Sequence, residues 1–310
     1  MPAHTPVLVE PLLRLTKPAD GRRDRVIDGT LGAGGHTRAL LQAGAGDVLA
    51  FDLDASAIEI ARRNLAPFIE RLTVAQTSYV DMGAVARQHG WPAVDAIILD
   101  LGLSSMQLDD PERGFAFRHE GPLDMRFDAL KQNLTAEALL NFLPERDLAD
   151  LFFRFGEEQA ARRIAGAIVA QRPIQSTAAL ANLVLTVQGT GRRMTKIHPA
   201  TKVFQALRIA VNRELEALEE ALPIAVDLLR PGGRLAVITF HSLEDRIVKQ
   251  RFRELAQNVV APPGMASIKE KRALVKLVNR KPIVPDDQER SSNPRCRSAK
   301  LRVVEKLKFD

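Results

Sequence analysis

Residues 28–36 combine a carboxylate with a glycine-rich run: Asp28 is followed by glycines at positions 29, 32, 34 and 35, and then by His36. Glycine adopts positive φ without steric cost, so such a run lets the backbone approach a ligand closely. A second carboxylate, Asp52, closes the next apolar segment. A carboxylate there could accept hydrogen bonds from both hydroxyls of a ribose. We therefore expect a nucleotide-like ligand; a glycine turn without a ligand and a solvated Asp52 are the simpler alternatives.

The spacing of this run does not match two common nucleotide-binding loops. The dinucleotide fingerprint G-x-G-x-x-G/A, read from Gly32, places Thr37 at its last small position, and a P-loop requires a lysine where the glycines here are followed by His36. The pattern suits a ligand with a ribose and a positive charge rather than a pyrophosphate. S-adenosylmethionine is such a ligand, and Asp28 could lie near its ammonium or sulfonium end. A nucleotide-dependent oxidoreductase is the disfavoured alternative.

These residues need a parallel sheet to bring them together. Apolar segments at 25–28, 48–51, 71–75 and 94–99 alternate with helical spacing, in a helix from Gly35 and another over 55–65 with Asp54 as its N-cap. This alternation predicts an α/β fold with a Rossmann-like parallel sheet covered on both faces. Ligands of such sheets bind outside the carboxyl ends of the strands. The polar residues at those ends are Asp28, Asp52, Tyr79 and Asp100.

The alternation stops between about 106 and 212, where no convincing strand is found. Helical periods occur instead at 136–142, 145–155, 157–171 and 177–187, and a long helix from Pro199 would place Val203 and Leu222 on one face. We predict an inserted all-helical domain over 106–212, between the two halves of the sheet domain at 1–105 and 213–310. The sheet resumes at 234–240, and an antiparallel pair at 273–278 and 301–307 closes it.

Charge is distributed unevenly along the chain, whose net charge is +6. Residues 159–213 hold nine Lys/Arg and no Asp or Glu, and residues 269–310 hold thirteen Lys/Arg against six Asp/Glu. Two separate basic regions suggest a polyanionic partner, above all a nucleic acid. A solubilising surface is the plainer alternative.

Other compositional features limit the classes of protein. Cys296 is the single cysteine and the six histidines are scattered, so we expect neither a disulfide nor a metal cluster. No apolar run approaches the ~18 residues of a membrane helix, and residues 1–4 do not resemble a signal peptide. We therefore expect a cytoplasmic location without a membrane partner.

A set of longer motifs resembles one family. They lie at residues 4–8, 28–36, 100–109, 121–126, 198–205, 240–246 and 293–295. In this order they resemble the bacterial 16S ribosomal RNA cytosine-N4 methyltransferases, which are class I S-adenosylmethionine-dependent enzymes, and they cover almost the whole chain. One departure is Cys296, where the family usually has alanine. The resemblance implies methylation of the exocyclic amine of a decoding-centre cytosine in the 16S rRNA of the small (30S) ribosomal subunit.

The resemblance also implies a cofactor pocket for S-adenosyl-L-methionine. Gly34, Gly35 and His36 would form the cofactor loop and Asp52 would hold the ribose. Tyr79, Asp100 and Gln107 would complete the adenosine pocket. For His36, the alternative is a solvent-facing residue at the start of a helix.

The residues that act on the amine are less well defined. Amine methyltransferases often have an acidic residue or asparagine followed by two prolines and an aromatic residue after the fourth strand, whereas here Asp100 is followed by Leu-Gly-Leu and then by Ser104 and Ser105. Asp100 could therefore serve the cofactor, the amine or both. Ser104, Ser105 and His241 are further catalytic candidates, although His241 could equally orient a loop.

A base inside folded RNA must leave its stack to reach such a pocket. We expect phosphate contacts from the helical insert and the C-terminal basic segment, through Arg192, Arg193, Lys196, Lys202, Arg295 and Arg297. A monomer and a homodimer are both compatible with the sequence. The non-enzymatic alternative is an RNA-binding ribosome assembly factor with a vestigial cofactor site.

Overall fold

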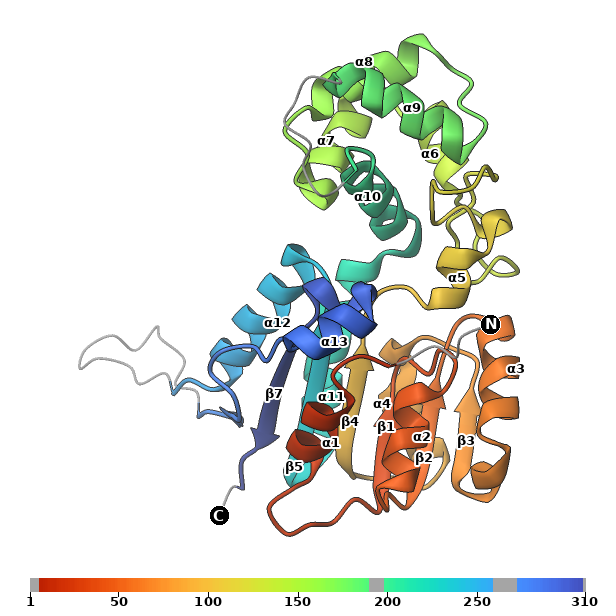
Figure 1. Ribbon diagram of the computed structural model, residues 1–310. Coiled ribbons are helices and arrows are strands. Elements are labelled where there is room, and N and C mark those ends of the chain that lie inside the picture. Colours follow the sequence, from red (N-terminus) through yellow and green to blue (C-terminus); the bar gives the residue numbers. More distant parts are fainter. Residues whose placement is uncertain (1–5, 190–197, 259–271, 309–310) are drawn as a thin grey trace, which may run out of the picture. The chain divides into compact units, whose positions relative to one another are not determined.

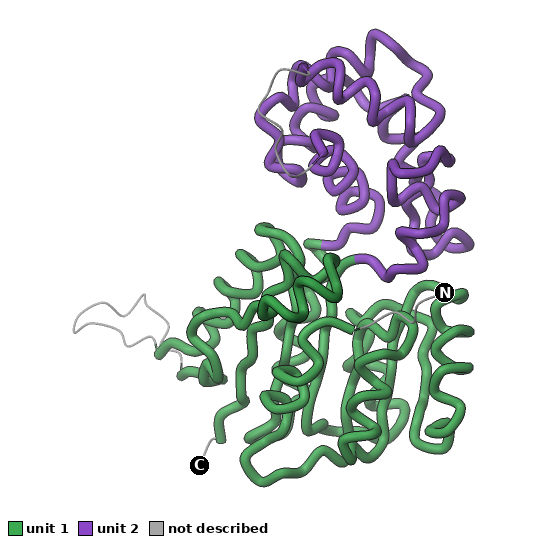
Figure 2. The backbone as a smooth tube through the Cα atoms, in the orientation of Figure 1, with its two compact units in different colours: residues 1–102, 215–310 green, residues 103–214 purple. Residues whose placement is uncertain are grey.

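The computed structural model describes residues 6–189, 198–258 and 272–308. Its contacts divide the chain into two compact units (Figure 2). Unit 1 combines Met1–Gly102 with Leu215–Asp310, and unit 2 is Leu103–Glu214. The chain therefore leaves unit 1 directly after the strand that ends at Asp100 and returns at the start of a helix.

Unit 1 is built on a seven-stranded sheet in the order β3-β2-β1-β4-β5-β7-β6 (Figure 1). Its strands are β1 Arg25–Asp28, β2 Asp47–Phe51, β3 Leu72–Ala75, β4 Val94–Asp100, β5 Leu229–Thr239, β6 Val275–Leu277 and β7 Lys300–Lys306. The first five pair in parallel, whereas β7 pairs antiparallel with both β5 and β6. The predicted Rossmann-like α/β sheet with an antiparallel closing pair is confirmed.

Alternate residues of the strands enter two different cores. On β1, Val26 packs with residues of α1 Val9–Thr16, α2 Gly35–Gln42 and α3 Ala55–Asn64. Ile27 packs instead with residues of α4 Met82–Gln88, α11 Glu214–Leu228 and α12 Ser242–Leu255. Helices therefore cover both faces of the sheet, which explains why its strands are apolar along their whole length.

The order of the strands reverses between β1 and β4. From β1 the chain proceeds outward through β2 and β3, and it then returns to place β4 on the other side of β1. Asp28 ends β1, and Asp100 ends β4 two residues beyond the pairing partner of Asp28, which is Ile98. Open α/β sheets bind ligands at such a switch point.

Unit 2 is helical in its described residues. Its helices are α5 Ser105–Asp109, α6 Ala136–Phe142, α7 Glu145–Gly156, α8 Ala161–Ala170, α9 Thr177–Gln188 and α10 Thr201–Asn212. They share one apolar core that includes the fully buried Phe152, Ile164 and Leu207. Three of the predicted helical segments agree with α6, α7 and α9 to within one residue.

The prediction of one helix running from Pro199 past Leu222 is wrong. Arg213 has φ 51° and separates α10 from α11. The side-chain amide of Asn212 donates to the carbonyl of Met125 (2.7 Å) and accepts from the N–H of Phe127 (2.8 Å). These tertiary contacts fix the end of α10 to the loop that contains Met125 and Phe127. The periodicity of apolar residues along the helix cannot predict them.

Three further differences from the sequence prediction are local. The helix predicted over 157–171 begins only at Ala161, because Glu157 has φ 49° and ends α7. Helix α1 was not predicted. The segment predicted as a loop between the closing strands contains α13 Asp287–Ser292 and a 3-10 helix, η4 Pro294–Ser298. None of the described helices has the length and apolar character needed to span a membrane.

Candidate active site

The glycine run forms the turn between β1 and α2. Gly34 is the N-cap of α2 and has φ 83°. A Cβ at this position would lie 2.8 Å from Cδ1 of Leu65, so both the backbone conformation and the space require glycine. The first N–H groups of a helix have no acceptor within the helix, and here they belong to Gly35 and His36 at the switch point of the sheet. The turn therefore offers a ligand hydrogen-bond donors at close range.

Asp28 organises this turn from inside the protein. Its side chain is 1% exposed, its Oδ1 accepts from the N–H of Thr30 (3.1 Å), and its Oδ2 accepts from Oγ1 of Thr37 (2.6 Å). Burial raises the pKa of this carboxyl. Thr37 is the residue that departs from the dinucleotide fingerprint, and its hydroxyl is the partner of Asp28. Asp28 thus shapes the loop and is shielded from solvent by it.

Asp52 follows the last residue of β2, and its carboxylate is hydrogen-bonded to the glycine turn. Its Oδ2 accepts from the N–H of Gly32 (2.7 Å), and its Oδ1 accepts from the N–H of Asp54 (2.9 Å). Each oxygen has a further lone pair with which to accept a ribose hydroxyl. Loss of hydration raises the pKa of Asp52 to about 6. Asp54 caps α3 through the N–H of Ser56 (3.0 Å), as predicted.

His36 bridges the end of β4 and the N-terminal segment. Its Nδ1 lies 3.3 Å from Oδ2 of Asp100, and its Nε2 lies 2.8 Å from the carbonyl oxygen of Val7. Burial of the ring opposes its charged form, but Asp100, the Val7 carbonyl and Asp28 together outweigh burial and raise the pKa of His36 to about 9. The ring is 5% exposed, so it is not the solvent-facing residue of the alternative interpretation.

Asp100 has one satisfied and one unsatisfied oxygen. Its backbone N–H donates to Oγ1 of Thr30 (2.6 Å), which joins the end of β4 to the glycine turn. Its Oδ1 is buried and has no hydrogen-bond partner among the described residues. A buried carboxylate oxygen without a donor is costly, so this oxygen has an unused capacity to accept a hydrogen bond.

Tyr79 lies beside the glycine turn. It begins the 3-10 helix η2 Tyr79–Asp81 after β3, and Ser78 caps this helix through the N–H of Val80 (3.3 Å). A Cβ on Gly29 would lie 3.1 Å from the Cβ of Tyr79. The turn after β3 and the turn after β1 therefore meet, and they place Tyr79 beside Gly29.

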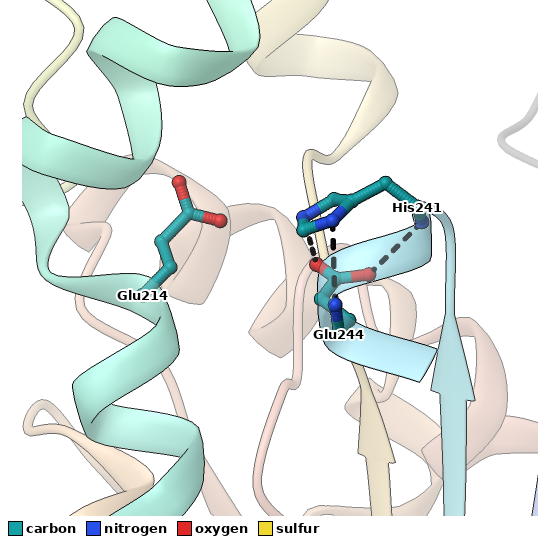
Figure 3. A group of neighbouring side chains, drawn as sticks. All are labelled: Glu214, His241 and Glu244. Carbon is teal, nitrogen blue, oxygen red and sulfur yellow. Dashed lines mark hydrogen bonds and ion pairs between the residues drawn. The ribbon is translucent and has the colours of Figure 1, made fainter. Parts of the chain in front are cut away.

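His241 starts α12, directly after β5. Its Nδ1 accepts from the N–H of Glu244 (3.4 Å), and its Nε2 lies 3.0 Å from Oε1 of Glu244 (Figure 3). The other oxygen of Glu244 accepts from the N–H of Phe240 (2.7 Å). This reciprocal capping box uses Nδ1 and the backbone N–H of His241, which donates to Glu244 at 3.3 Å. Nε2 is buried and has no hydrogen-bond partner among the described residues. Glu214, also drawn, pairs with Arg208 at 2.8 Å within unit 2.

Ser104, Ser105 and Gln107 belong to unit 2. The N–H of Ser104 donates to Oε1 of Gln107 (3.1 Å), and Oγ of Ser104 accepts from the N–H of Gln107 (3.2 Å). These bonds form a capping box at the start of α5. Ser105 is the half-buried first residue of that helix. The Ser104 hydroxyl therefore has a structural partner within its own unit.

The predicted RNA-binding residues are divided between the units. Arg295 and Arg297 are exposed on η4 of unit 1. Lys202 is exposed on α10 of unit 2, where its Nζ donates to the carbonyl of Glu157 (2.8 Å). The remaining three, Arg192, Arg193 and Lys196, lie outside the described residues.

Sequence reasoning missed the residues that hold the turn from the N-terminal side. Pro6 lies against Gly35, where an added Cβ would be 3.1 Å from Cβ of Pro6. The N–H of Leu8 donates to Oε1 of Glu289 (2.7 Å) on α13, so the segment that contacts His36 is also tied to the C-terminal region. The contact of Leu8 is made by its backbone N–H, and residue type gives no signal for such a contact.

The donors and acceptors fit a cationic nucleoside. The N–H groups at the start of α2, the free lone pairs of Asp52 and the ring of Tyr79 suit a ribose with its base. Three carboxyl groups, those of Asp28, Asp52 and Asp100, lie around the turn and suit a cationic ligand better than a pyrophosphate. The arrangement is therefore compatible with S-adenosylmethionine.

Known proteins resemble the chain over its whole length. A protein named ribosomal RNA small subunit methyltransferase H from Thermomicrobium roseum is 48% identical, and the match covers 99% of this chain and 94% of that protein. A protein of the same name from Syntrophobacter fumaroxidans is 47% identical, and the match covers 98% of this chain and 96% of that protein. A third, from Heliobacterium modesticaldum, is 46% identical and covers 98% of this chain and 99% of its own. The profile of the MraW methylase family matches residues 1–307. With this match and the S-adenosylmethionine-compatible turn, the chain belongs to the MraW methylase family.

Proposed function

We propose that this protein methylates the exocyclic N4 amine of a decoding-centre cytosine in the 16S rRNA of the small ribosomal subunit, with S-adenosylmethionine as the donor. The observation that carries the proposal is that two carboxylates, those of Asp52 and Asp100, lie at one glycine turn and differ in the hydrogen bonds they make. Asp52 has lone pairs left for a ribose, and Asp100 has one buried oxygen without a donor among the described residues. The names of the full-length relatives support an rRNA substrate.

The residues of unit 1 would bind the cofactor by its ribose and its base. Asp52 accepts the ribose hydroxyls while the Gly32 and Asp54 N–H groups keep its carboxylate in place. Gly34 and Gly35 let the backbone approach, and Tyr79 packs beside the base. By the resemblance of the motif at 100–109, Gln107 of α5 is a further candidate for cofactor binding. When bound, the cofactor supplies a methyl group on a sulfonium sulfur, which keeps the electron pair of the broken C–S bond.

The amine would be handled by Asp100. Cytosine N4 is conjugated with its ring and is a poor nucleophile, so it must be held in line and must release one proton for each methyl gained. Oδ1 of Asp100 can accept a hydrogen bond from the amine and then that proton. The capping box gives His241 a positioning role at the start of α12, because its Nδ1 and backbone N–H both bond to Glu244. Ser104 and Ser105 are alternative polar contacts for the base.

RNA would be bound by the basic residues of both units. Arg295 and Arg297 are exposed on unit 1 and Lys202 on unit 2; Arg192, Arg193 and Lys196 complete the proposed set. Phosphate contacts of this kind supply affinity and register, while the shape of the RNA supplies much of the specificity. The helical unit 2 would serve recognition of the assembled subunit in the cytoplasm.

The test is transfer of a labelled methyl group to small subunits and, in parallel, to naked 16S rRNA. We expect label in N4-methylcytidine after nucleoside digestion with wild-type protein, and a decrease in its rate of about a hundredfold or more with Asp100→Asn. An assembly factor would bind subunits without transferring label. An oxidoreductase would show calorimetric binding of NAD in place of S-adenosylmethionine. Either outcome would overturn the proposal.

A further inference from the structure

We propose that His36 is a positioning residue for methyl transfer: it holds Oδ2 of Asp100 so that Oδ1 faces the amine of the target base. The inference rests on the proposed function. It gives His36 a role in methyl transfer that is separate from forming the glycine turn and from binding the cofactor. Its basis is a chain of contacts from Val7 through His36 to Asp100, all within unit 1.

The two nitrogens of His36 are both occupied by acceptors. Nε2 lies 2.8 Å from the Val7 carbonyl, which can only accept, so this nitrogen carries a proton. Nδ1 faces a carboxylate oxygen at 3.3 Å. A ring between two acceptors is held as an imidazolium, and neither nitrogen is left to bind a ligand or accept a proton. The side chain of His36 therefore acts through Asp100.

Asp100 is held asymmetrically as a result. Oδ2 faces the imidazolium, and the backbone N–H of Asp100 is fixed by Thr30 at 2.6 Å. Oδ1 is buried without a donor among the described residues. With its backbone and one oxygen anchored, the carboxylate can turn little, and Oδ1 keeps its direction before the ligand arrives. Such preorganisation is worth most when the partner must be aligned for attack.

The ligand group that fits Oδ1 is an N–H donor. The sulfonium and ribose of the cofactor cannot fill this role, because a sulfonium carries no N–H and the ribose has Asp52 on β2. β4 lies between β1 and β5, on the side of β1 away from β2. The exocyclic amine of cytosine offers two N–H groups and must lose one proton. The methionyl ammonium of the cofactor is the other candidate donor, and the experiment below separates the two.

The charges around the ring explain why a cation is needed there. Asp28 and Asp100 both face His36, and Asp52 in turn faces Asp28. The carbonyl of Val7 adds a further negative dipole from the N-terminal segment. In this group, the imidazolium is the one positive charge beside Asp100. Without it, no positive charge of this group would hold Oδ2, and the carboxylate could rotate away from the amine.

The variant that tests this is His36→Gln, which keeps polarity and removes the charge. We expect kcat for small subunits to fall by roughly tenfold or more, while the dissociation constant of S-adenosylmethionine, measured by calorimetry, changes by less than about threefold. In an Asp100→Asn background, His36→Gln should have almost no further effect, because the two residues act as one unit. Arg38→Gln, an exposed charge on the same helix, is the control.

Two results would overturn the positioning role. One is a His36→Gln enzyme with the kcat of the Arg38→Gln control. The other is a loss confined to cofactor affinity, which would assign Oδ1 to the methionyl ammonium. A wild-type protein that transfers no methyl group refutes the proposed function itself. Nitrogen NMR of the wild-type protein gives a test that needs no variant: His36 should have both nitrogens protonated at pH 7.5, and a neutral ring there would refute the inference.

Discussion

Oγ1 of Thr37 donates a 2.6 Å hydrogen bond to Oδ2 of Asp28, and both side chains are buried at 0% and 1% exposure. Thr37→Val keeps the shape of the side chain and removes the donor. It should lower the free energy of unfolding by about 1–3 kcal/mol, because it leaves a buried oxygen unpaired. Urea denaturation measures this decrease. Thr37→Ser retains the hydroxyl and should cost less; equal stability of the valine and serine variants would contradict the assignment.

Asp52 should make cofactor affinity depend on pH. Its carboxylate must be ionised to accept both ribose hydroxyls, and burial raises its pKa to about 6. Calorimetric affinity for S-adenosylmethionine should therefore fall as the pH decreases through about 6. Asp52→Asn should weaken binding roughly 10–100-fold at pH 7.5 and remove most of this dependence. Asp47→Asn, at the exposed start of the same strand, is the control.

The raised pKa of Asp52 makes the stability of the folded protein change with pH in the direction opposite to cofactor affinity. A carboxyl whose folded-state pKa is raised binds its proton more tightly when folded. The contribution of Asp52 to stability is thus fully present below the unfolded value near 3.8 and is lost as the pH rises through about 6. Between these values, Asp52→Asn should gain stability relative to wild type as the pH rises. Thermal melting across this window checks the sign, and a gain in the other direction would contradict it.

Gly34 and Gly44 form a matched pair for separating backbone strain from crowding. Both have positive φ, 83° and 85°, but an added Cβ meets Leu65 at 2.8 Å only at Gly34 and meets nothing within 4 Å at Gly44. Gly44→Ala should cost about 1–2 kcal/mol for the left-handed backbone. Gly34→Ala should cost more and should also weaken cofactor binding. Unfolding free energies and calorimetry measure both effects; equal costs would show that Leu65 yields without strain.

Arg295 and Arg297 should contribute to RNA affinity through charge. Their joint replacement by alanine should weaken binding to small subunits and reduce the slope of log affinity against log salt by about 1.4, or about 0.7 for each phosphate that is no longer neutralised. Filter binding between low and high salt measures the slope. Replacing Arg22, which is also exposed in unit 1, should leave the slope unchanged. An identical change for both replacements would mean that only net charge matters.

Asp245 joins α12 to β7 through Arg302 at 2.7 Å and Lys300 at 3.2 Å. Burial works against its charge, but these two cations outweigh burial and lower the pKa of Asp245. Asp245→Asn should lower the unfolding free energy by about 3 kcal/mol at pH 7, since it leaves Arg302 without its buried partner. Because the pKa is lowered, this difference is present above the unfolded value of 3.8 and vanishes as the pH falls through the folded value. Glu254→Gln in an exposed pair with Arg251 should cost little.

The pattern of apolar and polar residues was sufficient to predict the parallel strands and the edge of the sheet at which the site lies. Apolar segments such as 94–99 predict buried strands because a strand covered on both faces has no polar side. The acidic ends at Asp52 and Asp100 mark one edge of the sheet because parallel strands all end there. The N-cap at Asp54 is a local hydrogen bond between residues two apart, so the sequence contains all of it.

The contacts that orient the site were decided by the tertiary structure. Periodicity predicts one helix through Arg213, but Met125 and Phe127, more than 80 residues away, hold Asn212 and end α10. The sequence places His36 in a cofactor loop, whereas its partners in the fold are a backbone carbonyl at Val7 and a carboxylate at Asp100. A residue's type states what it can donate or accept. Only the fold determines which acceptor lies within reach, because those partners come from different strands and loops.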